Sequence, residues 1–177
     1  MNKTYKIDEL YKVIDKCIEQ ERVFIADPVL DPIHFGFTKS IVRYVKLREK
    51  YPYLIIQAVN SRFILDANHI KKILALSLYA KKNKTLLSKK IETDILLRFA
   101  CTTQISQAIK VAGRKPKNDF VIIGIGKKST LDKLHSDLIS YLNPQPISKN
   151  NHEFLKKQFK ISKKQMSTLS SSDPLED

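Results

Sequence analysis

Two short amphipathic segments joined by a polar turn constrain the fold of this chain most. They lie within residues 84–113, which read KTLLSKKIETDILLRFACTTQISQAIKVAG. Apolar residues recur at helical spacing over 91–99 and again over 105–112. We therefore expect two helices that each bury one face.

Polar residues stand where these two helices should begin and end. Ser88 can cap the first helix, and Thr102 or Thr103 the second, because a hydroxyl oxygen can accept a hydrogen bond from the free amides of a first turn. Gly113 should end the second helix in a left-handed conformation.

The remaining segments predict a mixture of strands and helices. We expect strands at Val23–Ala26, Tyr53–Val59 and Phe120–Ile125, with an edge strand at Gln145–Ser148. The expected helices are an N-terminal one over 7–18, one over 33–50, one capped by Asp66 or Asn68 that runs to Lys82, one with its apolar face from Leu131 to Leu142, and a short basic one over Asn151–Phe159. The interpretation is an α/β (α+β) domain in which several helices cover a small mixed sheet. We expect residues 1–160 to form this single domain and residues 161–177 to form a polar, mobile tail.

The chain is strongly basic. Its 177 residues hold 32 Lys and Arg against 18 Asp and Glu, which gives a formal net charge of +14. Such a surplus favours an acidic partner. A lysine-rich proteome would explain the same surplus without any partner.

No arrangement of residues indicates catalysis. The four histidines are scattered and lack the spacing of a zinc site, and Gly124-Ile-Gly126 before Lys127 is not a phosphate-binding loop. We expect no enzyme activity, no metal and no cofactor. Cys17 and Cys101 fit reduced, buried residues of a cytoplasmic protein, and no apolar run is long enough to span a membrane.

Basic and amide side chains surround the two helices. Lysines contact phosphates without reading sequence, while amide and hydroxyl groups such as those of Thr103 and Gln104 can bind the bases of a single strand. This combination fits the end of a single-stranded nucleic acid. A second basic run over 156–164 is either a solvated face or an additional contact surface for RNA.

Further motifs stand in a fixed order around the helix pair. They are the small and apolar helix His69–Ala80, the basic link Lys81–Lys84, Thr85-Leu86, Asp94-Ile95-Leu96-Leu97, Gln104-Ile105, Ala108-Ile109, Gly113 and the strand Phe120–Ile125. In these motifs and their spacing, residues 54–126 resemble the Cgi-one-twenty-one family. The family usually has glutamate where this chain has Asp94, and often Ser-Gly where it has Ala100-Cys101.

The resemblance implies a role in tRNA modification. That family is the kinase-binding accessory subunit of the KEOPS complex, which makes threonylcarbamoyladenosine (t6A) in tRNA. Its members bind the small atypical kinase of the complex and recruit tRNA by its 3′ CCA end, and their final segment is usually a longer apolar helix. The tRNA-binding residues that the resemblance implies here are Lys81, Lys82, Lys84, Arg98, Thr103, Gln104 and Ile105.

Two other classes of function stay open. One is a stand-alone basic protein that binds RNA or DNA. The other is a pure protein–protein adaptor whose charge reflects its proteome.

Overall fold

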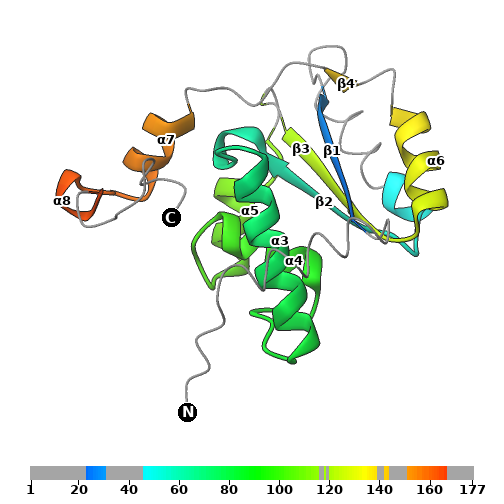
Figure 1. The fold of residues 1–177 in the computed structure, drawn as a ribbon, viewed down its shortest axis with the longest axis horizontal. Coiled ribbons are helices and arrows are strands. Elements are labelled where there is room, and N and C mark those ends of the chain that lie inside the picture. Colours follow the sequence, from blue (N-terminus) through cyan, green and yellow to red (C-terminus); the bar gives the residue numbers. More distant parts are fainter. Residues whose placement is uncertain are drawn as a thin grey trace.

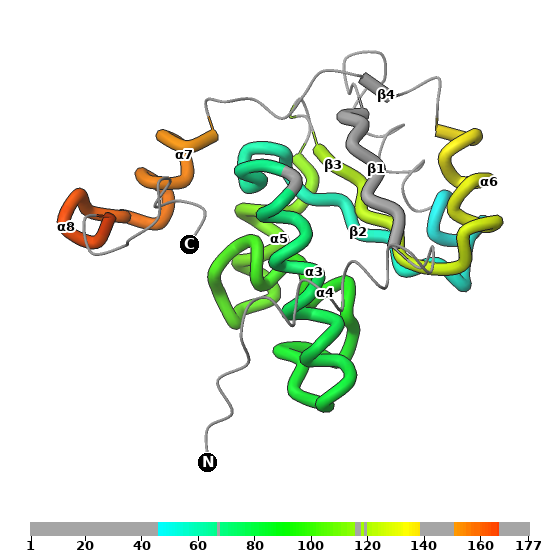
Figure 2. The backbone as a smooth tube through the Cα atoms, viewed as in Figure 1, coloured from blue at the N-terminus to red at the C-terminus, as the bar shows by residue number. Residues whose placement is uncertain are grey.

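The computed structural model describes residues 46–115, 118, 120–138 and 151–166, together with the backbone of 23–30 and 142–143 (Figure 2). The helix expected over 7–18 and the edge strand expected over 145–148 lie outside these residues. In chain order the elements are β1 (Val23–Leu30), β2 (Ile55–Asn60), the 3-10 turn η1 (Ser61–Phe63), α3 (Ala67–Lys82), α4 (Ile91–Phe99), α5 (Ile105–Ala112), β3 (Phe120–Ile125), α6 (Lys128–Leu138), β4 (Leu142–Asn143), α7 (Asn151–Gln158) and α8 (Lys163–Met166). Residues 46–50 are also helical.

The strands form a four-stranded sheet in the order β2-β3-β1-β4 (Figure 1). Every pairing between these described strands is antiparallel, and β3 lies opposite β2 with Ile56 paired to Gly124 and Val59 to Val121. All six residues of β3 are buried, which fits its unbroken apolar sequence. The predicted α/β class, with helices covering a small sheet, is confirmed, but the sheet was expected to be mixed and the described strands pair only in antiparallel fashion.

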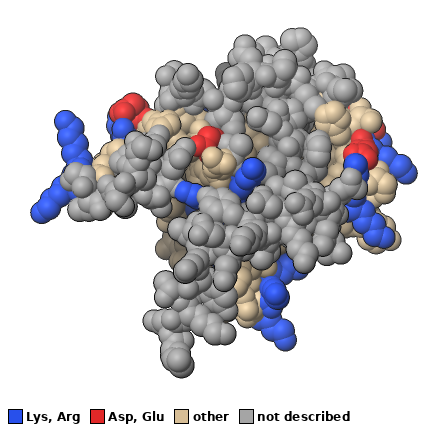
Figure 3. Space-filling view, viewed as in Figure 1, with Lys and Arg blue, Asp and Glu red and all other residues tan. Residues whose placement is uncertain are grey.

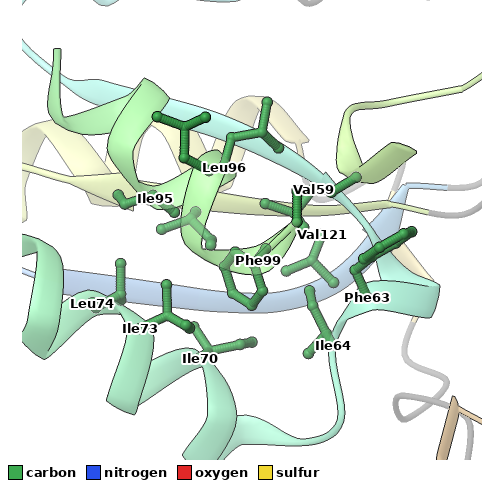
Figure 4. Packing of buried hydrophobic residues seen from close by; sticks show 14 of the residues in the cluster. Val59, Phe63, Ile64, Ile70, Ile73, Leu74, Ile95, Leu96, Phe99 and Val121 are labelled. Carbon is green, nitrogen blue, oxygen red and sulfur yellow. The ribbon is translucent and has the colours of Figure 1, made fainter. Parts of the chain in front are cut away.

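Helices cover both faces of the sheet (Figure 1). Alternate residues of a strand point to opposite faces. Val59 and Val121 therefore join the core under α3, α4 and α5, whereas Ile56 and Ile122 join a second core under α6. Figure 4 shows the first core, in which Phe99 of α4 lies among side chains from α3, β2 and β3. The sheet thus separates the α3–α5 layer from α6.

Helices α3 and α4 run in opposite directions. The ring of His69, in the first turn of α3, meets the ring of Phe99, in the last turn of α4, with centroids 5.2 Å apart. The connection over residues 83–90 therefore lies at the far end of both helices. We call this connection, together with the last two residues of α3, Lys81 and Lys82, the hairpin tip.

Helix α7 is attached to the start of α3 by polar and aromatic contacts. The buried side-chain amide of Asn151 donates to the carbonyl oxygens of Ser61 and Ile64, at 2.9 and 2.7 Å. Phe154 meets the ring of Phe63 edge-on, with centroids 5.3 Å apart. These contacts fix α7 at the end of α3 opposite the hairpin tip.

Several local predictions are corrected by the structure. Ser88 does not cap α4; its hydroxyl accepts from the Lys90 amide and donates to the Lys90 carbonyl. Gly113 is extended, at φ −68° and ψ 164°, and pairs with Val59 of β2. Its small size matters because a Cβ there would collide with the Ile109 carbonyl oxygen. Leu142 belongs to strand β4 and not to a helix.

Other local predictions hold. Asp66 caps α3, since its carboxylate accepts from the His69 amide at 2.7 Å. Leu131, Leu134 and Leu138 form the buried face of α6.

Candidate functional site

The hairpin tip presents cations on an ordered turn. Lys81, Lys82 and Lys84 are all exposed. Lys84 adopts a left-handed conformation with φ 59°, and the amide of Thr85 donates to the Ala80 carbonyl at 2.8 Å. This hydrogen bond closes α3 as glycine-ended helices usually close. The three lysines are therefore held at the helix end, where the helix dipole also favours positive charge.

Asp94 fixes the rest of the tip to α4. Its side chain is fully buried, and one carboxylate oxygen accepts from the Leu87 backbone amide at 2.7 Å. The other accepts from Nε of Arg98, also at 2.7 Å. A buried carboxylate is stable only with such partners. Asp94 thus connects the tip, the start of α4 and the last turn of α4.

Arg98 has a structural role that the sequence did not reveal. Its side chain is 19% exposed and pairs with Asp94. Much of the positive charge of Arg98 is therefore balanced by the buried carboxylate of Asp94. Of the cations predicted for the site, Arg98 is the one least open to an external phosphate.

The turn between α4 and α5 exposes the polar residues of the predicted site. Thr103, Gln104 and Ile105 are exposed in succession at the start of α5. Neither Thr102 nor Thr103 caps α5, which corrects the prediction, because the helix begins one residue later with Gln104 at the cap position. The hydroxyl of Thr102 accepts from the Gln104 amide at 3.2 Å and shapes the turn before the helix. Gln104 occupies the cap position of α5 without a side-chain hydrogen bond to the helix. Its amide side chain is accordingly not committed to capping.

Cys101 stands in this turn with φ 48°. It is exposed, which corrects the expectation of a buried residue, and its thiol donates to the Arg98 carbonyl oxygen at 3.6 Å. Nearby atoms still raise the pKa of the thiol through partial desolvation.

Helix α5 leaves part of its apolar face uncovered. Ala108 and Ala112 are fully buried against the first core, whereas Ile105 and Ile109 are 47% and 57% exposed. All four residues share one side of the helix, since they are spaced by three and four positions. We call Ile105 and Ile109 the apolar strip. Sequence periodicity marked the whole stripe as core, and only the packing shows which half is open.

The seven residues of the predicted site do not form one cluster. Lys81, Lys82 and Lys84 lie at the hairpin tip, which precedes α4, whereas Thr103, Gln104 and Ile105 follow the end of α4. A nine-residue helix is about 13 Å long. The tip lysines and the α4–α5 turn are therefore separate surfaces joined by α4.

Two other features are absent from the described residues, a metal-binding cluster and a membrane-spanning helix. No group of three or more His, Cys, Asp or Glu there could hold a metal ion. Within the same part of the chain, no helix is both long enough and apolar enough to cross a membrane.

Comparison with known proteins identifies one family. The family model described as kinase binding protein CGI-121 matches residues 38–177. This range contains both cores, the hairpin tip and the α4–α5 turn. No curated protein sequence matches the chain.

Proposed function

Since the chain belongs to the family of kinase binding protein CGI-121, we propose that it is a non-catalytic subunit of the KEOPS complex. In this role it binds the small atypical kinase of the complex and recruits tRNA through the 3′ CCA end for t6A synthesis. The observation that carries the proposal is the surface at the start of α5, where polar and apolar groups are exposed side by side.

The apolar strip supports the kinase-binding part. Ile105 and Ile109 expose large aliphatic side chains on a helix that is well packed on its other side. Exposed apolar groups on a rigid element are typical of protein interfaces. We therefore assign the kinase contact to Ile109 of the strip and leave Ile105 to the α4–α5 turn.

The α4–α5 turn supports the tRNA-binding part. Thr103 and Gln104 offer hydroxyl and amide groups that can pair with the edges of unstacked bases, and Ile105 offers an apolar surface beside them. The basic character of the chain supplies the attraction for phosphates.

Kinase binding is tested with a matched pair of variants. Ile109→Glu places a charge in the strip, whereas Gln107→Glu places the same charge at an exposed position on the other side of α5. A charge in an apolar contact costs on the order of 2 kcal/mol, or about thirtyfold in affinity. Titration calorimetry with the kinase should show this loss for Ile109→Glu alone. Equal affinities for the two variants would place the kinase elsewhere.

The tRNA part is tested with intact tRNA and with tRNA that lacks the CCA end. We expect much weaker binding of the trimmed tRNA, and a further loss of about 1 kcal/mol for Gln104→Ala with the intact form. Binding that ignores the CCA end, in a chain that does not bind the kinase, would favour the stand-alone RNA-binding alternative. Kinase binding without tRNA binding would favour the pure adaptor.

A further inference from the structure

A second basic surface lies on α7 and α8. Residues 151–166 contain five lysines, at 156, 157, 160, 163 and 164, and a single carboxylate, Glu153. Glu153 accepts from Lys156 at 3.2 Å. The segment therefore carries a net charge of +4, from five lysines and one glutamate. Lys157, Lys160 and Lys163 are exposed, and we call these three residues the α7–α8 lysines.

The other side of α7 is fixed to the protein. Asn151 and Leu155 are both buried, at 5% exposure each. Phe159 packs against the first core, and its ring lies 6.2 Å from that of Phe63. Because this face is held in place, Lys157 of α7 and Lys160 just after it are presented outward, while Lys163 begins the short helix α8, in which no residue is buried.

Local backbone stability does not account for the residue at position 160. Lys160 has φ 54°, and the Ile161 amide closes the end of α7 by donating to the Lys156 carbonyl at 2.9 Å. Glycine would adopt this conformation at less cost. Lysine therefore costs backbone stability at this position, as it does at Lys84 of the hairpin tip, which has φ 59°.

The position of these lysines matters as much as their charge. Helix α7 rests on residues just before α3, and the His69–Phe99 contact brings the end of α4 to the same end of α3. The hairpin tip lies at the other end of α3, whose 16 residues span about 24 Å. Figure 3 shows lysine and arginine side chains projecting both at the side of α7 and α8 and, separately, at the tip. That separation exceeds the distance of about 8 Å over which salt screens exposed charges.

We propose that the α7–α8 lysines form the main phosphate-binding surface for an RNA strand that reaches the α4–α5 turn. This inference rests on the proposed tRNA-binding function and changes where the tRNA backbone lies. The tip lysines then contribute less than the sequence resemblance implies.

The exposed side of α7 and α8 fits RNA better than a membrane. The exposed large apolar residues of the described chain are Tyr53, Leu76, Leu87, Ile105 and Ile109, and none of them lies on α7 or α8. A helix that binds a lipid surface needs apolar anchors beside its cations. The α7–α8 lysines lack such anchors and lie at the same end of α3 as the exposed amide and hydroxyl groups of the α4–α5 turn. This arrangement suits contact with a phosphate backbone.

Two charge-matched triple variants test the proposal. One is Lys157→Glu/Lys160→Glu/Lys163→Glu, and the other, at the hairpin tip, is Lys81→Glu/Lys82→Glu/Lys84→Glu. Affinity for intact tRNA and for tRNA without the CCA end is measured at several salt concentrations, with melting temperature and kinase affinity as controls.

The α7–α8 variant should lose on the order of tenfold or more in tRNA affinity, and its salt dependence should be shallower by about 2, from three contacts at about 0.7 each. The tip variant should lose clearly less. Equal losses of tRNA affinity in the two variants, or a larger loss in the tip variant, would overturn the inference. The proposed function would still stand if wild-type binding depended on the CCA end. A loss in the α7–α8 variant together with indifference to the CCA end would instead support this surface and overturn CCA recruitment. Loss of kinase affinity in place of tRNA affinity would show that the surface binds an acidic protein.

Discussion

At the scale of single residues, left-handed backbone conformations fall on residues other than glycine. Lys84, Cys101 and Lys160 each follow the end of a helix with φ between 48° and 59°. In the described chain no glycine has a positive φ. An L-residue in this conformation costs roughly 1 kcal/mol relative to glycine. At each of these helix ends, glycine would therefore be more stable than the residue present.

Replacing Cys101 with glycine should stabilise the protein. We expect a gain of about 1 kcal/mol, or a rise of about 2–4 °C in melting temperature for a chain of this size. The matched control is Lys110→Gly at an exposed position inside α5, which should lose about 1 kcal/mol. A lower melting temperature for Cys101→Gly would show that the thiol makes a contact worth more than the backbone strain.

His69 should make stability depend on pH. Burial, aided by Lys72 and opposed by Asp66, lowers the pKa of His69 from 6.5. Its Nδ1 accepts from the Leu65 amide at 3.1 Å, which requires the neutral ring. The unfolded chain therefore binds the proton more readily, so the stability that neutral His69 contributes is complete above about pH 6.5 and is lost as the pH falls.

Urea unfolding between pH 5 and 8 measures this dependence. The variant His69→Asn keeps an acceptor but does not titrate, so its stability should fall less on acidification. Parallel curves for wild type and variant would assign the pH dependence to other groups.

At the scale of elements, the α3–α4 hairpin depends on one buried carboxylate. Asp94 is the only acid among the fully buried side chains described, and it connects the hairpin tip to Arg98. For this reason, charge reversal at Arg98 would disturb the fold as well as any contact with tRNA. The tip lysines, which are exposed, are the cleaner sites for testing phosphate contacts.

Asp94→Asn should loosen the tip without unfolding the domain. The asparagine oxygen accepts from the Leu87 amide more weakly than a carboxylate oxygen does, and the charged bond to Arg98 is lost, at a cost of about 2 kcal/mol. Denaturant unfolding gives the stability, and hydrogen exchange at the Leu87 amide reports the tip. If hydrogen exchange at the Leu87 amide were unchanged while the expected free energy of about 2 kcal/mol was lost, the Arg98 pair would matter and the tip contact would not.

At the scale of the whole molecule, Asn151 joins parts of the chain that are far apart in sequence. It donates to Ser61 and Ile64, which precede it by 90 and 87 residues. This contact attaches α7, and through it the α7–α8 lysines, to the layer formed by α3, α4 and α5.

Substitutions at Asn151 should release α7. Asn151→Ala leaves two carbonyl oxygens without their donor, which costs about 2 kcal/mol. Asn151→Asp should cost more, because a carboxylate would face those same oxygens. Hydrogen exchange at the backbone amides of α7 should accelerate in the same order. If Asn151→Asp proved as stable as Asn151→Ala, the side chain would have to be free to turn away from the carbonyls.

Local sequence patterns alone determined much of this protein. The apolar run Phe120–Ile125 was predicted as a strand with its observed bounds, and Asp66 was predicted as one of two caps for α3, because both depend on neighbouring residues. The order of motifs also identified the family, which the match over residues 38–177 confirmed.

Only the tertiary structure decided how the candidate site is arranged. The antiparallel packing of α3 and α4 separates the tip lysines from Thr103 and Gln104 and brings α7 to the end of α3 where α4 finishes. The same packing binds Arg98 to a buried carboxylate and leaves half of the α5 stripe exposed. Periodicity shows which face of a helix is apolar. Which neighbour covers that face depends on contacts between residues far apart in the chain, and these contacts exist only in the folded protein.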